Sequence, residues 1–291
     1  MDEFTAVVRA REFIRQAGIN SIPVEMDHYL KTAKATYRVR YDFPEDVSGN
    51  TTRISGRHGI FVNGQHTLER QRFTMLHEIA HIVLGLLSNH DSLLKSAVLM
   101  SYARRPPEEV CCDAFAAACL LPYDFFKKDV DRHLVGFGSV EQLAADYRAS
   151  LTCTGSRCAL VNEAPCAFVL AESGVVRYVS RSKLMRERKC WIKISMPLPQ
   201  GSAAQKVRSG DIVDGSIEVD PGLWIEDPRR GDAYLFEEAR LLPEWDQVLS
   251  LLWFEEGSGN GDDVFDDMDD DEGRLEELDG ILPWPSKKRR R

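Results

Sequence analysis

The sequence predicts an α+β protein with a mainly helical N-terminal domain that contains a small sheet and with an α+β C-terminal domain. Long amphipathic segments with helix-capping residues dominate the first half of the chain. From about residue 159, short β-rich segments separated by turn residues replace them. The end of the chain is too acidic and too poor in apolar residues to fold alone. We therefore expect domains at residues 1–155 and 156–254, followed by a flexible tail at 255–291.

Two helices and two strands are expected before residue 65. Apolar residues recur on one helical face from Phe4 to Ala17, and Gly18 is typical of a helix stop. A second helix is expected at Val24–Ala35. Thr36–Phe43 and Gly59–Val62 are rich in residues that favour strands, and the turn-forming residues 48–50 are expected to connect them.

The centre of the first domain is predicted to be a long helix at Leu68–Leu84. Thr67 can cap its first turn, and Gly85 can end it. Other helices are expected at Ser92–Met100, from Pro106 and Pro107 to Leu121, at Tyr123–Leu134 and at Ser139–Tyr147.

The second domain is predicted to be built on an antiparallel sheet. Its expected strands are Ala159–Asn162, Ala167–Ala171, Val175–Ser180, Trp191–Met196, Gly215–Val219 and Ala233–Glu238.

The net charge of −9 belongs to the tail. Residues 255–280 hold thirteen carboxylates and one arginine, and the last eleven residues hold five basic side chains. The rest of the chain is close to neutral. This tail is expected to be a solvated end, or else to fold back on the body or to steer a basic partner.

The cysteines and the apolar runs indicate a cytoplasmic location. The seven cysteines are odd in number and irregularly spaced, and no basic leader followed by an apolar stretch begins the chain. Reduced thiols are therefore expected. No run reaches the roughly 18 apolar residues of a membrane span, so no membrane partner is expected.

A metal site is indicated by His77-Glu78-Ile79-Ala80-His81. Two histidines four apart on a helix project from one face, so both imidazoles can reach one zinc ion. Glu78 lies beside them and can act as general base toward a zinc-bound water. The apolar flanks of this helix argue against a surface helix that merely carries two histidines, because buried histidines need partners.

A third ligand is required, and Glu109 is the best candidate, early in the helix that follows Pro106. Asp113 shares its face four residues later and can orient a ligating histidine. Glu108 is the rival ligand. Alternatively, acidic residues at a helix N-terminus are favoured by its dipole alone. Two histidines and a carboxylate suit Zn²⁺.

These residues resemble the signature of the ImmA/IrrE family of metallo-endopeptidases. The similarity covers Arg72–His81, the preceding segment Phe61–Asn63, and Glu109–Pro122. It is specific over about residues 20–150 and looser over 160–250, which is similar to the family's GAF-like sensor region. This chain has Asp113 where the family often has asparagine, and it carries an unusual cysteine pair at residues 111 and 112.

The resemblance implies a zincin-like, gluzincin-type peptidase with His77, His81 and Glu109 as zinc ligands and a C-terminal GAF-like regulatory domain. It implies a helix-turn-helix repressor of the phage-repressor type as substrate, whose cleavage releases genes for DNA-damage response or phage defence. A signal ligand at the second domain is a further expectation. The alternatives are an anti-repressor that binds without cleaving, and a sensor with a structural metal. Direct DNA binding is not expected, because the helical segment 123–150 is not strongly basic.

Cys112 suggests a possible thiol switch. It lies three residues after Glu109, about 60° from it around the helix, whereas Cys111 is expected to point into the core. A thiolate near zinc would displace the catalytic water, which would keep the enzyme latent. The alternative is that Cys112 is simply a small buried residue.

Overall fold

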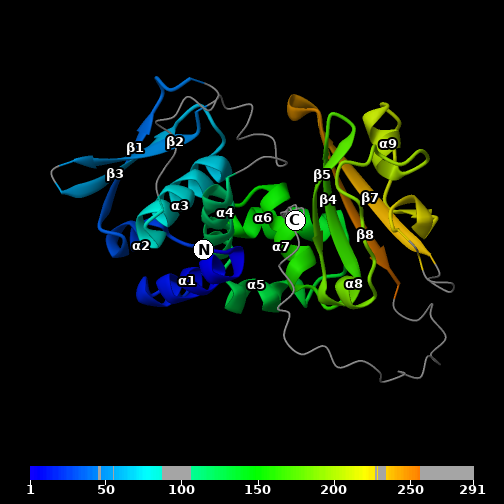
Figure 1. Cartoon of the computed structure of the whole chain (residues 1–291), viewed down its shortest axis with the longest axis horizontal. Helices are drawn as coiled ribbons and strands as arrows, with labels where there is room; N and C mark the ends of the chain where they lie inside the picture. Colours follow the sequence, from blue (N-terminus) through cyan, green and yellow to red (C-terminus); the bar gives the residue numbers. More distant parts are fainter. Residues whose placement is uncertain (45–46, 55, 87–105, 227, 229–233, 256–291) are drawn as a thin grey trace, which may run out of the picture. The chain divides into compact units, whose positions relative to one another are not determined.

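The structure is a computed structural model that describes residues 1–44, 47–54, 56–86, 106–226, 228 and 234–255 (Figure 1). The chain divides into two compact units, Met1–Glu163 and Ala164–Arg291. Both units combine helices with a sheet, so the predicted α+β class is confirmed. The division follows Glu163, later than the boundary at residues 155 and 156 expected from the sequence, because one more helix belongs to the first unit.

Two helices begin the first unit. In α1 (Glu3–Gln16), the Asp2 carboxylate accepts a hydrogen bond from the backbone N–H of Thr5 at 2.7 Å. Gly18, with φ +66°, lies just beyond the end of α1, as the sequence predicted. Helix α2 (Met26–Thr32) is shorter than expected.

The small sheet has three strands, one more than the sequence predicted. They are β1 (Ala35–Arg40), β2 (Gly49–Ile54) and β3 (Arg57–Asn63) in the order β1-β3-β2, with β1 parallel and β2 antiparallel to β3. Gly49 and Asn50, expected in a connection, therefore begin an edge strand. A Cβ on Gly49 would lie 2.7 Å from the carbonyl oxygen of Phe61, so glycine here serves close approach to β3 and does not mark a turn.

Two central helices carry the predicted site, and the first of them, α3, packs against strands β2 and β3 of this sheet. Helix α3 (Leu68–Leu84) has the predicted bounds, with a Thr67 side-chain cap and Gly85 at φ +66°. Helix α4 (Pro107–Leu120) begins at the predicted prolines and packs against α3. The helix expected at Ser92–Met100 lies outside the described residues.

Three helices complete the first unit: α5 (Tyr123–Val130), α6 (Phe137–Tyr147) and α7 (Leu151–Val161). The expectation of a strand at Ala159–Asn162 was wrong. These residues are the last turn and cap of α7. The N-cap of this helix is Ser150, whose hydroxyl accepts a hydrogen bond from the N–H of Cys153. The short apolar run 159–161 cannot by itself distinguish a strand from a helix end.

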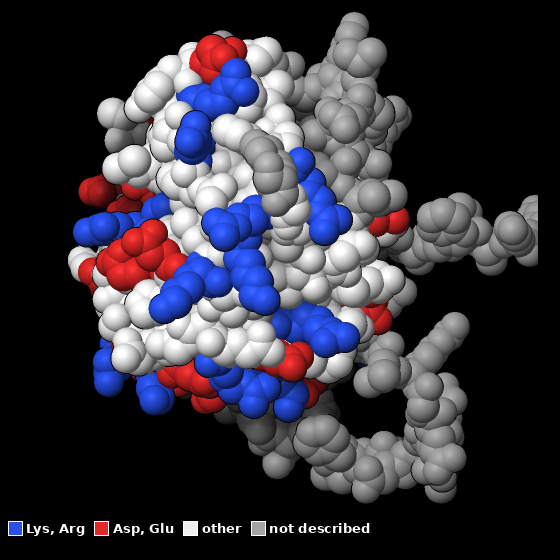
Figure 2. Space-filling model, turned by 90° about the vertical axis from the view of Figure 1, so that its left-hand side faces the viewer, with Lys and Arg blue, Asp and Glu red and all other residues white. Residues whose placement is uncertain are grey.

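The first unit has a basic surface that the overall charge conceals. Six exposed Lys and Arg side chains lie between the end of α2 and the start of β3, at Lys31, Lys34, Arg38, Arg40, Arg53 and Arg57. Figure 2 views the side of the molecule on which α2, β1 and β3 lie in Figure 1, and blue side chains gather there. This face is therefore cationic although the whole chain carries −9.

The second unit is built on a five-stranded antiparallel sheet in the order β5-β4-β8-β7-β6. Its elements are β4 (Cys166–Glu172), β5 (Val175–Arg181), α8 (Lys183–Glu187), α9 (Ala203–Arg208), β6 (Ile217–Val219), the 3₁₀ turns Pro221–Leu223 and Pro243–Trp245, β7 (Leu235–Leu242) and β8 (Gln247–Phe254). The predicted antiparallel sheet is confirmed, but strand β8 was missed. The strand expected at Trp191–Met196 was wrong, because there Trp191 makes only an isolated bridge to Glu226.

A buried carboxylate ties the second unit together. Glu237 on β7 has no exposed surface. It accepts hydrogen bonds from the backbone N–H groups of Ala203 and Ala204, from the indole N–H of Trp224 and from the hydroxyl of Ser250. Four protein donors, two of them at the start of α9, therefore satisfy this buried carboxyl group in place of water.

Among the described helices, none is both long and apolar enough to cross a membrane.

Candidate metal centre

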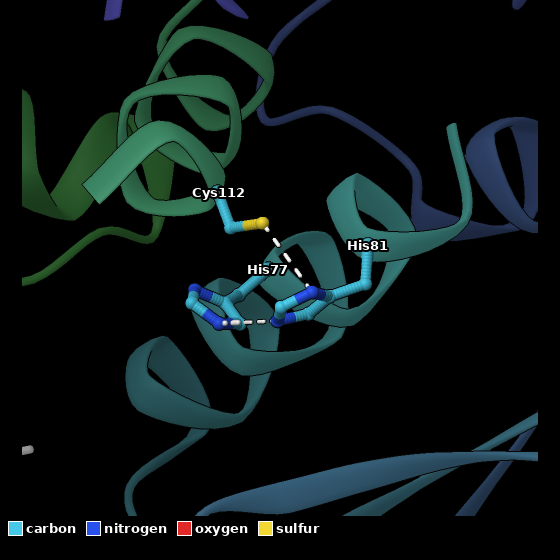
Figure 3. A group of neighbouring side chains, drawn as sticks. All are labelled: His77, His81 and Cys112. Carbon is cyan, nitrogen blue, oxygen red and sulfur yellow. Dashed lines mark hydrogen bonds between the residues drawn. The ribbon is translucent and has the colours of Figure 1, made fainter. Parts of the chain in front are cut away.

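Helix α3 brings the two histidines of the motif together. His77 and His81 lie one turn apart, and their Nε2 atoms are 3.2 Å from each other (Figure 3). Both side chains are buried, with 9% and 4% of their surfaces exposed. The expectation that one helical face presents both imidazoles is therefore met.

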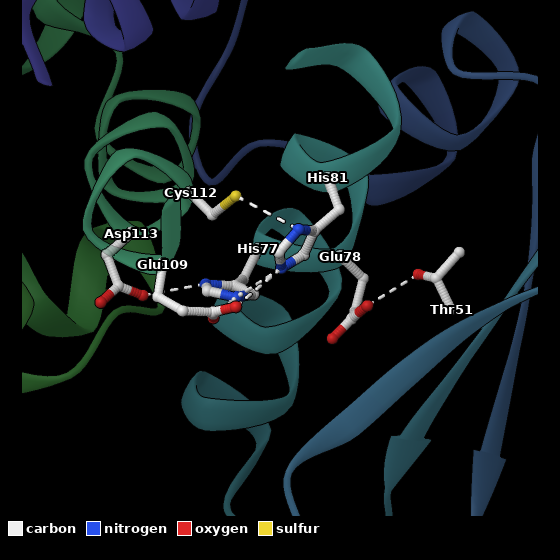
Figure 4. A network of polar contacts seen from close by, with 7 residues as sticks. All are labelled: Thr51, His77, Glu78, His81, Glu109, Cys112 and Asp113. Atoms are coloured by element: carbon white, nitrogen blue, oxygen red, sulfur yellow. Dashed lines mark hydrogen bonds and ion pairs between the residues drawn. The ribbon is translucent and has the colours of Figure 1, made fainter. Parts of the chain in front are cut away.

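Helix α4 brings a carboxylate to the same point. Oε2 of Glu109 lies 3.0 Å from Nε2 of His77, and Oε1 lies 3.6 Å from Nε2 of His81. Glu109 is buried, whereas Glu108, the rival ligand, is exposed at the first turn. The structure thus places Glu109, and not Glu108, against the histidines (Figure 4).

The three groups fit a zinc ion. Tetrahedral coordination with bonds of about 2.0–2.2 Å places ligand atoms about 3.3–3.6 Å apart. The observed separations of 3.0, 3.2 and 3.6 Å are close to that spacing. Moreover, Oε1 of Glu109 is buried and has no hydrogen-bond partner among the described residues. A buried acceptor of this kind is expected where a cation belongs.

The charge state of Glu109 also suits a ligand. Burial by itself raises the pKa of the Glu109 carboxyl, but its interactions with the nearby rings of His77 and His81 outweigh burial, and the pKa is lowered overall. The carboxylate therefore remains ionised at neutral pH.

Asp113 lies where an orienting group is needed. Its Oδ1 is 2.9 Å from Nδ1 of His77, the ring nitrogen that does not face Glu109. A carboxylate there favours the proton on Nδ1, so the lone pair of Nε2 is on the side that faces Glu109 and His81, where a metal would bind. This is the geometry expected for the role predicted for Asp113.

Cys112 also reaches this cluster, from the other side of His81. Its Sγ lies 3.6 Å from Nδ1 of His81. His77, His81 and Cys112 each have a ligand atom within 4.8 Å of the others, so they form a second group that could hold a metal ion. We prefer the set with Glu109, because it uses the facing Nε2 atoms of both rings with shorter separations. The neighbouring Cys111 is buried, as predicted, with its Sγ 3.5 Å from the carbonyl oxygen of Met1.

The predicted base has a partner that the sequence did not reveal. Glu78 is 1% exposed, and its Oε2 accepts a hydrogen bond from the hydroxyl of Thr51 at 2.7 Å (Figure 4). Thr51 lies on the edge strand β2, which we had expected to be part of a connection. The sequence could have pointed to Thr51 only if that strand had been recognised.

Comparisons with known proteins relate part of this chain to a peptidase family. Residues 28–158 match the profile of the IrrE N-terminal-like domain, Peptidase_M78, a family of metallopeptidases. A solved structure described as a Mycobacterium tuberculosis transcriptional regulator has a similar fold. It is 11% identical, with a TM-score of 0.56, and the match covers 87% of this chain and 76% of that one. No match was found among curated proteins.

Proposed function

We propose, on the premise that residues 28–158 form an IrrE N-terminal-like domain, that the protein is a zinc-dependent endopeptidase that cleaves a helix-turn-helix transcriptional repressor. The observation that carries the peptidase proposal is the triangle of His77, His81 and Glu109, with Glu78 adjacent on α3. Metallopeptidases with this motif use two histidines and a third protein ligand and keep one position for water.

The residues divide the work of peptide hydrolysis. A zinc ion held by His77, His81 and Glu109 would lower the pKa of a water molecule and polarise the scissile carbonyl. Glu78 accepts a proton from the attacking water and delivers it to the nitrogen of the leaving amine as the C–N bond breaks. Thr51 holds one oxygen of Glu78, and Asp113 fixes the ring of His77.

The second unit supplies regulation in this proposal. It has its own hydrophobic core around Trp224 and the sheet, separate from the metal centre. We assign it the role of a GAF-like sensor that binds an unidentified signal ligand. In this proposal the protein acts in the cytoplasm, where cleavage of the repressor releases stress or phage-defence genes. The match to Peptidase_M78 and the transcriptional regulator of similar fold support this setting.

The test uses the full chain loaded with zinc and, as probe, the helix-turn-helix repressor encoded beside its gene. Mass spectrometry of the mixture should show two repressor fragments from a single cut. The Glu78→Gln variant should bind zinc with wild-type affinity and leave the repressor intact. Repressor release by that variant would instead identify a non-cleaving anti-repressor. An intact repressor with the wild type would contradict the proposal.

A further inference from the structure

The two ring nitrogens of His81 face different partners. Nε2 faces Nε2 of His77 and the Glu109 carboxylate, at 3.2 and 3.6 Å. Nδ1 faces Sγ of Cys112 at 3.6 Å. Figure 4 shows the thiol on the α4 side of the ring, away from the point where Nε2 and Glu109 meet.

An imidazole that binds a metal through Nε2 carries its proton on Nδ1, and that proton needs an acceptor. His77 has the Asp113 carboxylate in this position. For His81, the atom in the equivalent position is the Cys112 sulfur, a weak acceptor whose contacts are longer than those of oxygen. Cys112 and Asp113, which are successive residues of α4, thus face Nδ1 of His81 and Nδ1 of His77, respectively.

The orientation of this contact bears on the thiol-switch hypothesis. A thiolate that displaced the catalytic water would have to approach the metal from the side of Nε2. Cys112 is completely buried and approaches His81 from the side of Nδ1. The two nitrogens of an imidazole ring point away from each other. A metal bound at Nε2 of His81 would therefore lie on the other side of the ring from the Cys112 sulfur, which contacts Nδ1.

We propose that Cys112 is a positioning residue, which accepts the Nδ1 hydrogen of His81 and holds Nε2 toward the metal without binding the metal itself. The inference rests on the metal site of the proposed function. It predicts that the thiol raises zinc affinity, whereas a latency switch predicts that the thiol blocks the site.

The experiment measures zinc affinity of the full chain by competition with a chromophoric chelator, for wild type, Cys112→Ser and Cys112→Ala. Loss of the acceptor in the alanine variant should weaken zinc binding about 10- to 100-fold. The serine variant, which keeps an acceptor, should stay within about threefold of the wild type. Cys111→Ala is the matched control on the same helix turn, and circular dichroism checks that each variant folds.

X-ray absorption at the zinc edge supplies the second readout. The wild type should show only nitrogen and oxygen neighbours, with no sulfur at about 2.3 Å. A sulfur neighbour in the wild type, an alanine variant with wild-type affinity, or equal losses for serine and alanine would each overturn the proposal. Failure of the wild type to bind zinc would overturn the proposed function itself, so the two failures are distinguishable.

Discussion

The contact between Thr51 and Glu78 gives the sharpest prediction about catalysis. Replacing Thr51 with valine keeps the branched shape and removes only the hydroxyl that donates to Oε2 of Glu78 at 2.7 Å. A hydrogen bond to a charged group contributes about 1.5–3 kcal/mol. If this stabilisation positions the base in the transition state, its loss corresponds to a fall in kcat of about 10- to 150-fold.

A second effect acts in the opposite direction. A donor to a carboxylate lowers its basicity, so its removal makes Glu78 a stronger base. We expect positioning to dominate, because Glu78 is almost fully buried and a misplaced general base loses the short approach to water that proton transfer requires. Zinc affinity should not change, since the Thr51 hydroxyl donates to the base Glu78, which is not one of the three proposed ligands.

The assay is the rate of repressor fragment formation at saturating and at low repressor concentration, which separates kcat from KM. The Thr51→Val variant should lower kcat with KM within about twofold of the wild type. Thr51→Ser should restore most of the rate, and Thr52→Val, an exposed neighbour on β2, is the matched control. An unchanged or higher kcat in Thr51→Val would refute the positioning role.

Two further predictions concern the buried carboxylates. Glu109→Ala should weaken zinc binding at least about 100-fold, because it removes a ligand, whereas the exposed Glu108→Ala should not; equal effects of the two would contradict the ligand assignment. Glu237→Gln should cost the second unit about 3 kcal/mol in urea unfolding, because an amide N–H₂ would face donors that now bond the carboxylate. The exposed Glu218→Gln on β6 is its control, and a loss no larger than in that control would show that the four donors do not stabilise the unit.

The elements that the sequence does not predict correctly are those with ambiguous local signals. The glycine that begins β2 was interpreted as part of a turn, although its role is close packing against Phe61. The run 159–161 was interpreted as a strand, although Ser150, nine residues earlier, is the N-cap of a helix that includes it. Strand β8 was missed although every residue from Val248 to Leu252 is buried. Of these elements, strand β8 pairs with β4, which lies about 80 residues earlier in the sequence.

The sequence by itself determined the helix that carries the candidate metal ligands His77 and His81, and the start of the helix that packs on it. Thr67, Gly85 and the paired prolines act within a few residues of the helix ends, and the four-residue spacing of His77 and His81 is a property of any helix. Only the tertiary structure decided that Glu109 rather than Glu108 faces the histidines, that Thr51 holds Glu78, and on which side of His81 the Cys112 thiol lies. These choices depend on how α4 and β2 pack against α3, and that packing is fixed by buried contacts between segments far apart in the chain, which no local pattern encodes.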